Sequence, residues 1–268
     1  YQRRVREYQI LETDRQSDLL SMHIALNRDT REKCQIIDYN MAQMSPAEQA
    51  QVNADIRQFA FQSPNIKHQI DRFNFRGRKM VVYEFLQGTE LGGLLLHLQT
   101  QKLQLEEIAL WDLAFCMLKA LHEIHSKNLV VSDLCLWSIA FSEEQKTWKL
   151  VQFEQCRAPS TCFEEEMACP EHAAPEQFMG ILRQESDIWA LGTIIYQMAA
   201  QRRPYTKQDM AAALQQKPFT IGRLEGYSES LNEFVVMMLN GDYTKRPSAV
   251  QLLNSQLLQS QMRVQARK

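Results

Sequence analysis

Asp133 is the residue whose type and surroundings make it the strongest candidate for chemistry in this sequence. Within residues 129–141 it occupies a polar elbow between two apolar runs. A carboxylate held at such an elbow can accept a proton from a reacting hydroxyl, or it can hydrogen-bond its own loop. The apolar residues of the preceding stretch, from Trp111 to His125, recur at helical spacing. The sequence therefore predicts a helix, a strand, a loop that carries Asp133, and a second strand.

Length and charge narrow the class of protein. The 268 residues can bury a full core, enough for one two-lobed domain or two small domains. Lysine and arginine together number 30 and aspartate and glutamate 32, and the net charge of −2 gives no electrostatic case for a nucleic-acid partner. No apolar run reaches the roughly 18 residues needed to cross a bilayer, so no membrane partner is expected.

The cysteines and the first residue indicate the compartment and the context of the chain. The six cysteines form no Cys-x-x-Cys pair, and the sequence opens without a signal peptide. Reduced thiols in the cytoplasm, with the nucleus as an alternative, are therefore expected. The sequence begins at Tyr1 and not at a methionine, which indicates a piece of a longer protein.

Three short motifs follow the Asp133 loop in a fixed order. Residues 174–176 read Ala-Pro-Glu, residues 186–192 read Ser-Asp-Ile-Trp-Ala-Leu-Gly, and residues 246–249 read Arg-Pro-Ser-Ala. Together with the Asp133 loop and the strand after it, these motifs resemble the large lobe of protein kinases of the serine/threonine branch. Agreement of five motifs in order and spacing is specific, whereas any one of them alone would be weak. The resemblance covers about residues 8–258.

The resemblance implies an α+β, bilobal protein-kinase-like fold. A small β-sheet lobe with one main helix would occupy residues 1–86, and a larger, mostly α-helical lobe residues 87–268. Ser45 and Glu48 have the signature of a helix N-terminus, from which the small-lobe helix should run to about Phe61. The other expected elements are strands at residues 8–11, 22–26, 33–38, 69–74, 79–85 and 147–154, and helices at 229–239 and 249–262.

The resemblance also assigns structural tasks to three residues of the large lobe. In the family, Glu176 pairs with Arg246, and Asp187 accepts hydrogen bonds from the backbone of the catalytic loop. All three residues are present in this sequence. We therefore expect a buried ion pair and a fixed loop around Val131 and Ser132.

The catalytic loop and the metal site depart from the family pattern. Asp133 falls on the catalytic aspartate, but Ser138 stands where the family has a metal-binding asparagine, and Cys135 replaces a lysine. Gln152 replaces the magnesium-binding aspartate, and a neutral amide is a weaker ligand than a carboxylate for that ion. Glu154 replaces the glycine of the same motif. The catalytic set is therefore not intact, and Asp133 is left as a vestigial catalytic residue.

The first hairpin lacks the glycines that allow a kinase loop to drape over phosphates. The first glycine of the chain is Gly77. The turn expected between the first two strands instead presents carboxylates at Glu12, Asp14 and Asp18, which would repel a triphosphate.

The third strand lacks the lysine with which kinases hold the phosphates. Ile37 occupies its place. Lys33 is an alternative cation, but it would reach the site only if the strand register shifted, which disturbs the hairpin. Near the place of the lysine's glutamate partner stands Asp55, whose side chain is one carbon shorter.

Residues 80–86 resemble the hinge between the two kinase lobes. Tyr83 would narrow the back of the nucleotide pocket, or it is a buried aromatic residue with its hydroxyl satisfied. The backbone from Glu84 to Leu86 would carry any residual adenine contacts. The degraded nucleotide site is therefore expected at these positions: Ile37, Asp55, Tyr83, Glu84, Leu86, Ser138 and Gln152.

These substitutions remove most of the charge neutralisation on which phosphoryl transfer depends. The sequence therefore predicts a pseudokinase that is not an enzyme, uses no cofactor, binds no metal and has no useful affinity for Mg-ATP. Its function would be protein binding in signalling, as a scaffold or an allosteric regulator. Its partner would be an active kinase or other domains of the same longer chain. The alternative is a weakly active or unorthodox nucleotide-dependent transferase that retains Asp133.

A zinc site in the segment before the Ala-Pro-Glu motif is a further alternative. Cys156, Cys162, Cys169 and His172 are close together in the sequence. Their spacings lack the tight Cys-x-x-Cys knuckle of structural zinc sites, so no metal is expected there.

Overall fold

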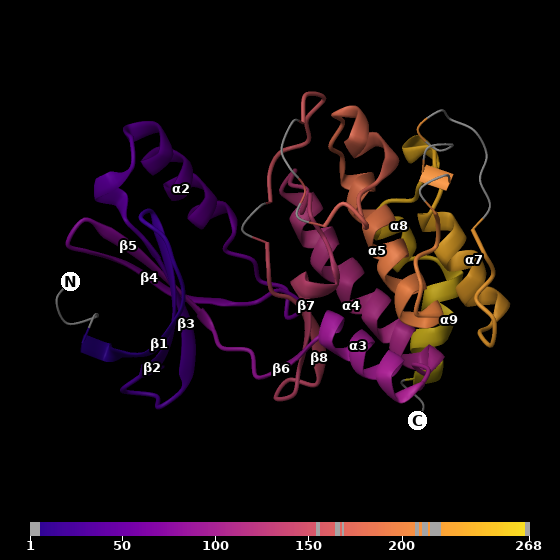
Figure 1. Ribbon diagram of the computed structural model, residues 1–268, viewed down its shortest axis with the longest axis horizontal. Helices are drawn as coiled ribbons and strands as arrows, with labels where there is room; N and C mark the ends of the chain where they lie inside the picture. The colour runs from indigo at the N-terminus through magenta and orange to yellow at the C-terminus, as the bar shows by residue number, and fades with distance from the viewer. Residues whose placement is uncertain are drawn as a thin grey trace. The chain divides into compact units, whose positions relative to one another are not determined.

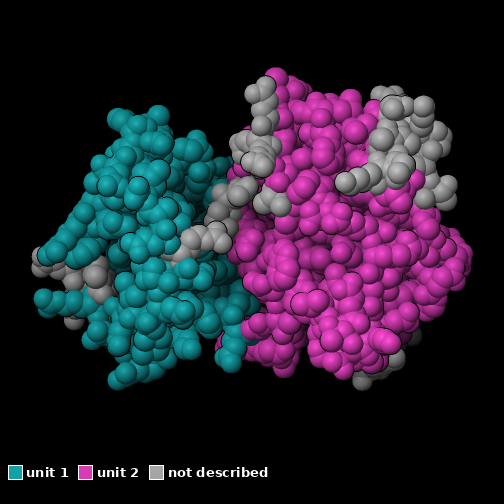
Figure 2. Space-filling view, viewed as in Figure 1, with its two compact units in different colours: residues 1–87 teal, residues 88–268 magenta. Residues whose placement is uncertain are grey.

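The computed structural model describes residues 6–153, 156–163, 167, 169–206, 209–210, 214 and 221–265. The chain divides into two units, residues 1–87 and residues 88–268 (Figure 2). The first unit contains a five-stranded antiparallel sheet with one long helix, and the second is mostly helical. This confirms the α+β, bilobal architecture predicted from the sequence. Among the helices of the described ranges, none is both long enough and apolar enough to cross a membrane.

The sheet of the first unit has the strand order β1-β2-β3-β5-β4, and each neighbouring pair is antiparallel. Its strands are β1 (Tyr8–Gln16), β2 (Leu20–Asn27), β3 (Lys33–Tyr39), β4 (Gln69–Phe75) and β5 (Arg78–Glu84). Alternate residues of a strand point to the same face. One such face buries a core made of Ala25, Cys34, Ile36, Phe73 and Val82.

The first hairpin is longer than predicted. β1 and β2 continue until they are joined by residues 17–19. Glu12 and Asp14 therefore lie within β1, and only Asp18 lies in the turn, which corrects the prediction of three carboxylates there. The cause is that β1 is an edge strand with mostly exposed residues, so its sequence lacks the apolar alternation from which strands are predicted.

The helix of the first unit, α2 (Pro46–Gln58), begins with the predicted cap. The Ser45 hydroxyl accepts the N–H of Glu48 at 3.3 Å, and the Glu48 carboxylate accepts the N–H of Ser45 at 2.7 Å. The helix ends three residues earlier than predicted. Phe59 and Phe61 are both buried, and their rings stack 6.2 Å apart, so the chain leaves the helix where both rings can be buried. A short 3₁₀ helix, η1 (Met41–Gln43), precedes α2.

The second unit combines helices with a three-stranded sheet of order β6-β7-β8 (Figure 1). Its strands are β6 (Gly88–Glu90), β7 (Ile139–Ser142) and β8 (Thr147–Leu150). Its α-helices are α3 (Leu91–Gln101), α4 (Glu107–Ser126), α5 (Gln184–Ala200), α7 (Glu229–Met238), α8 (Ala249–Leu253) and α9 (Gln256–Gln265). Its described residues also form the 3₁₀ helices η2 (Leu136–Ser138), η3 (Pro175–Met179) and η4 (Tyr243–Lys245).

Helices α4 and α5 pack against each other and form the core of the second unit (Figure 1). Almost every residue of α5 from Ser186 to Ala199 is buried, so this helix is covered on all sides. Gly192 permits the close approach of α7, because a Cβ atom at this position would lie 2.8 Å from the Cβ of Met238. The glycine of the Ser-Asp-Ile-Trp-Ala-Leu-Gly motif is thus required by packing.

The helix predicted at residues 249–262 is in fact two helices, α8 and α9. The backbone turns at Asn254 and Ser255, where the Ser255 hydroxyl accepts the N–H of Leu258 at 3.3 Å. A serine that bonds nearby backbone groups competes with helix continuation, which explains the break. The apolar spacing alone did not reveal it, because it continues across the junction.

Candidate functional site

The loop before Asp133 is held by the carboxylate of Asp187, at the start of α5. This carboxylate accepts the N–H of Val131 at 2.8 Å and the N–H of Ser132 at 3.2 Å. It also lies 2.8 Å from Nε2 of His125, at the end of α4. Asp187 is 1% exposed, so these bonds are protected from water. The link expected between Asp187 and the loop backbone is present.

The same bonds explain why the predicted strand before Asp133 does not form. The stretch makes only one bridge, in which Val130 exchanges two backbone hydrogen bonds with Arg157 at 2.8 and 3.0 Å. The next two amides point at Asp187 and not at a neighbouring strand. Ser132 has a φ of +70°, a left-handed conformation that is costly for residues other than glycine. The loop geometry is therefore imposed by its surroundings.

Asp133 lies beside the segment that precedes the Ala-Pro-Glu motif. Its Oδ1 atom accepts the backbone N–H of Cys169 at 3.0 Å. The side chain is half-buried, and together with Cys169 and His172 it lines a small recess. The side-chain amide of Gln177 strengthens this junction by donating to the carbonyl of Ser132 at 2.8 Å. Asp133 is therefore positioned by contacts within the second unit.

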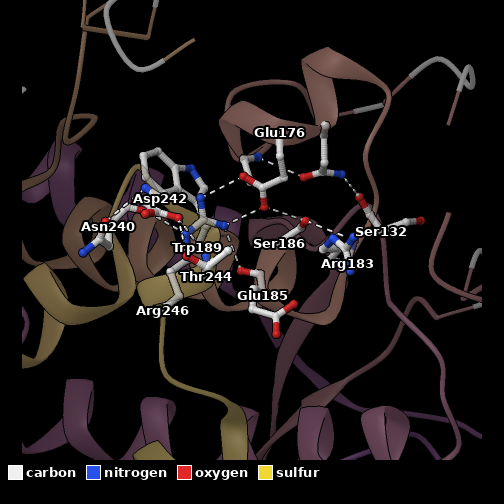
Figure 3. A network of polar contacts seen from close by, with 12 residues as sticks. Ser132, Glu176, Arg183, Glu185, Ser186, Trp189, Asn240, Asp242, Thr244 and Arg246 are labelled. Carbon is white, nitrogen blue, oxygen red and sulfur yellow. Dashed lines mark hydrogen bonds and ion pairs between the residues drawn. The ribbon is translucent and has the colours of Figure 1, made fainter. Parts of the chain in front are cut away.

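The ion pair expected between Glu176 and Arg246 is present and buried (Figure 3). The two guanidinium nitrogens Nη1 and Nη2 bond the two carboxylate oxygens at 2.6 and 2.8 Å. The Ser186 hydroxyl donates to Glu176 at 2.8 Å, and the guanidinium lies 4.9 Å from the ring centre of Trp189. Arg246 also donates to the carbonyl of Asn240 at 2.6 Å. Because further bonds support both charges, the pair joins η3, α5 and the chain around η4 into one network.

The two side chains at the positions where the family has metal ligands are placed differently. Ser138 is 1% exposed, and its hydroxyl donates to the carbonyl of Cys135 at 2.8 Å and accepts the N–H of Cys135 at 2.9 Å. This serine therefore closes its own loop. Gln152 lies just after β8 and is exposed. β8 ends at Leu150, four residues before the predicted end, and Glu154 lies outside the described residues.

In the first unit, Ile37 lies in the middle of β3 opposite Val81 and is 1% exposed. Lys33 is the first residue of the same strand and is exposed, with its ammonium 5.5 Å from the ring centre of Phe85. β3 pairs continuously with β2 and β5, so no register shift brings Lys33 to the place of Ile37. Asp55, in α2, accepts the side-chain amide of Gln51 at 2.7 Å.

The predicted hinge positions lie at and after the end of β5. The Glu84 carboxylate accepts the N–H of His68 at 2.7 Å, and Leu86 is half-buried. Tyr83 is 3% exposed, and the ammonium of Lys67 lies 5.5 Å from its ring centre. Lys67 also bonds the side chain of Gln35, the residue opposite Tyr83 on β3.

The sequence analysis missed Lys67, a buried cation next to Tyr83. It lies just before β4, in a stretch that reads as a loop, so its sequence position carried no signal for burial. The pairing of Gln35 with Tyr83 across β3 and β5 is what brings the three side chains together.

Three further groups near Asp133 have shifted pKa values. The Cys169 thiol, as a hydrogen-bond partner, lowers the pKa of Cys135 to about 7, although burial opposes this. The pKa of Cys169 is raised in turn, first by the same contact with Cys135 and then by burial. Burial lowers the pKa of His172 to about 4, and its Nδ1 lies 2.8 Å from the Thr193 hydroxyl.

The zinc alternative is not supported by the side-chain positions. In the described part of the chain, no three or more histidine, cysteine, aspartate or glutamate side chains are grouped so that they could hold a metal ion. His172 is engaged by Thr193, and Cys156 is buried.

Comparison with known proteins gives one family. A model of the family described as "Protein kinase domain" matches residues 22–258. A probable serine/threonine-protein kinase nek2 of Dictyostelium discoideum is 27% identical over 186 residues, which cover 66% of this chain and 44% of that protein. Serine/threonine-protein kinase Nek2 of Homo sapiens is 26% identical over 210 residues, with 73% and 46% covered. Mitogen-activated protein kinase kinase kinase 17 of Arabidopsis thaliana is 30% identical over 155 residues, with 53% and 40% covered.

The chain spans less than half the length of each of these three relatives. The comparisons confirm the resemblance to protein kinases of the serine/threonine branch that the motifs indicated. They are consistent with the fold described above, in which the Asp133 loop and the motifs after it form one packed unit.

The comparisons also overturn one prediction, that the chain is not an enzyme. The matched model is that of a kinase domain, and the relatives are named as serine/threonine-protein kinases, which points to an enzyme. The prediction rested on the side chains at a few substituted positions. The family model matches the domain as a whole, including the Asp133 loop and the motifs that support it.

Proposed function

Because this chain belongs to the protein kinase family, we propose that it is a signalling domain that acts by binding a protein partner, as a scaffold or an allosteric regulator. The partner is an active kinase or another domain of the same longer polypeptide. One observation supports this proposal most. The contacts that build the second unit are complete, at Glu176 with Arg246 and at Asp187, while Ser138 is turned into its own loop.

We also propose that the domain binds Mg-ATP only weakly. Kinases neutralise the phosphates with a strand lysine and two metal ligands. Here the corresponding positions hold the apolar side chain of Ile37, the engaged hydroxyl of Ser138 and the neutral amide of Gln152. A hard dication prefers carboxylate oxygens to such groups. A surface of the folded domain can still bind a protein partner, because such binding does not require the phosphate and metal ligands that are missing at these three positions.

The net charge and the fold support one chemical class of partner. We propose a protein partner and not a nucleic acid or a membrane, because the net charge is −2 and the kinase fold presents a packed domain surface. The proposed compartment is the cytoplasm, with the nucleus as the alternative, because the cysteines are free thiols in the described structure.

Two measurements test the proposal. A thermal-shift titration with ATP, with and without magnesium, should give no rise in melting temperature. In a second assay, candidate active kinases are incubated with the domain, and the rate at which they phosphorylate their own substrate is measured. A change in that rate identifies an allosteric regulator, and binding without a change identifies a scaffold. A magnesium-dependent rise in melting temperature together with no partner binding would contradict the proposal.

A second candidate function is a weakly active or unorthodox nucleotide-dependent transferase. It is favoured by the kinase names of the relatives and by Asp133, which is held in a fixed loop. Phosphate incorporation into a protein substrate that Asp133→Asn abolishes, with an unchanged melting temperature, would establish this function. The variant Asp112→Asn, on α4 of the same unit, is a control that should leave incorporation unchanged.

A further inference from the structure

Cys135 and Cys169 belong to segments that are 34 residues apart in sequence and meet beside Asp133 (169 minus 135). Cys135 directly precedes η2, where Ser138 holds both its N–H and its carbonyl. Cys169 is fixed by its own N–H, which donates to the Asp133 carboxylate at 3.0 Å. Asp133 lies two residues before Cys135, so these backbone bonds hold the two cysteines next to each other.

The side chains of the two cysteines also interact. The Cys169 thiol is the hydrogen-bond partner of the Cys135 sulfur. The backbone N–H groups of Trp137 and Ser138 also bond that sulfur and favour its thiolate. Burial and the negative charge of Asp133 raise the pKa of Cys135 and so disfavour its thiolate. The negative charge of Glu171 likewise raises the pKa of Cys169. The balance lowers the pKa of Cys135 to about 7.

This pair differs from the other cysteines whose surroundings are described. Burial raises the pKa of Cys34 to about 11 and also raises that of Cys116, so both stay protonated. Cys162 is exposed and Cys156 is buried. A thiolate next to a second thiol is the arrangement in which a sulfenic acid, once formed, is converted to a disulfide.

We propose that Cys135 and Cys169 form a reversible oxidation site, at which a peroxide joins the catalytic loop to the segment before the Ala-Pro-Glu motif by a disulfide. Cys135 is buried, with 4% of its surface exposed, whereas Cys169 is only partly buried and lines the recess beside Asp133. The pair is therefore accessible from the side of Cys169.

The reaction consumes one peroxide and releases two molecules of water. The Cys135 thiolate attacks one peroxide oxygen; an S–O bond forms, the O–O bond breaks, and the departing hydroxide takes up a proton. The Cys169 thiol then attacks the sulfenic sulfur; the S–S bond forms, the S–O bond breaks, and water leaves with the thiol proton. Two electrons pass from the sulfur pair to the peroxide. A dithiol reductant restores both thiols by exchange.

Hydrogen peroxide is the probe for a direct test on the full chain. After treatment, the protein is digested without reduction, and cross-linked peptides are identified by mass spectrometry. We expect one major cross-link, between the peptides that contain Cys135 and Cys169, with the mass of two hydrogens lost. Dithiothreitol should remove it. Cys162→Ser, which alters the exposed thiol of the same segment, should leave the yield unchanged.

A trapping experiment checks the order of the steps. In Cys169→Ser, the sulfenic acid of Cys135 cannot be resolved, so dimedone should label Cys135 several-fold more than in the unaltered protein. If the variant does not fold, the cross-link map of the unaltered chain and of Cys162→Ser still decides the question. A major cross-link between other cysteines would overturn the proposal. The proposal would also be wrong if the peptides of Cys135 and Cys169 both stayed reduced after other thiols were oxidised.

Discussion

The carboxylate of Asp187 holds the N–H of Ser132, 3.2 Å away, at a residue whose φ is +70°. The same buried carboxylate also accepts the N–H of Val131 and contacts His125. A residue that keeps a left-handed conformation without being glycine depends on such contacts. Asp187 is therefore a residue whose loss should affect the fold before it affects any chemistry.

We predict that Asp187→Ala destabilises the protein by about 3–5 kcal/mol, because two buried amides and a histidine lose their acceptor. Urea unfolding gives this free energy, and hydrogen exchange at Val131 and Ser132 should speed up. Asp133→Ala is the control: its half-buried carboxylate accepts the N–H of Cys169, so a loss of about 1 kcal/mol is expected. Equal losses in the two variants would contradict the prediction.

Arg246→Ala should destabilise the protein by about 3–5 kcal/mol, because it leaves the buried Glu176 carboxylate without its partner. The double variant Glu176→Gln with Arg246→Ala should lose less than the sum of the two single variants. Lys245→Ala provides a matched control next in sequence. Its ammonium pairs with Asp242 at 3.2 Å but is 69% exposed, so the expected loss is below about 1 kcal/mol.

Stability should fall in mild acid because of His172. Burial lowers its folded pKa to about 4, and Glu171 opposes this shift while Arg203 adds to it. The unfolded chain, with a pKa near 6.5, therefore binds more protons between the two values, so stability is lost as pH falls below about 6.5. From pH 8 to pH 5, the contribution of His172 should shrink by about 2 kcal/mol.

The measurement is urea unfolding at pH 8 and pH 5 for the unaltered protein and for His172→Gln. Other groups also titrate in this range, so the quantity to compare is the difference between the two proteins at each pH. That difference should be smaller at pH 5 than at pH 8. A constant difference would show that the buried imidazole is not responsible.

Gln152→Asp should give the domain a measurable magnesium-dependent increase in ATP affinity, about tenfold, because a carboxylate replaces an amide at the position where the kinase family has its magnesium-binding aspartate. Gln152 is exposed, so the substitution should not affect folding. Gln145→Asp, another exposed glutamine of the same unit, is the control for the added charge. Equal affinities in the two variants would show that a carboxylate at position 152 does not bind the metal ion.

Sequence patterns predicted those parts of the structure that depend on local or strongly apolar signals. The strands β3, β4 and β5 are confirmed to within one residue at each end, and the capping box of α2 begins at Ser45 as predicted. Apolar alternation and a paired serine and glutamate are visible without knowledge of the fold. The polar second half of the edge strand β1, after Leu11, and the break at Asn254 carry no such signal, because exposure and a side-chain bond decide them.

In the candidate site, likewise, some contacts could be predicted from the sequence and others could not. The contact of Glu176 with Arg246 could be expected, because each residue lies in a recognisable motif. The approach of Cys169 to Cys135 and the burial of Lys67 beside Tyr83 depend on how distant segments pack. Placing the segment before the Ala-Pro-Glu motif next to the Asp133 loop would have been the signal for the first. Nothing in the local sequence of Lys67 distinguishes it from an exposed loop lysine.

The burial of α5 on all sides has a consequence for how the domain opens. Amide protons of a helix that has no exposed face exchange with solvent only when the whole surrounding unit unfolds. The exchange rate of α5 amides therefore reports the full unfolding free energy of the second unit. Amides of β3 report the first unit in the same experiment, so their relative rates reveal whether the two units unfold together or one before the other.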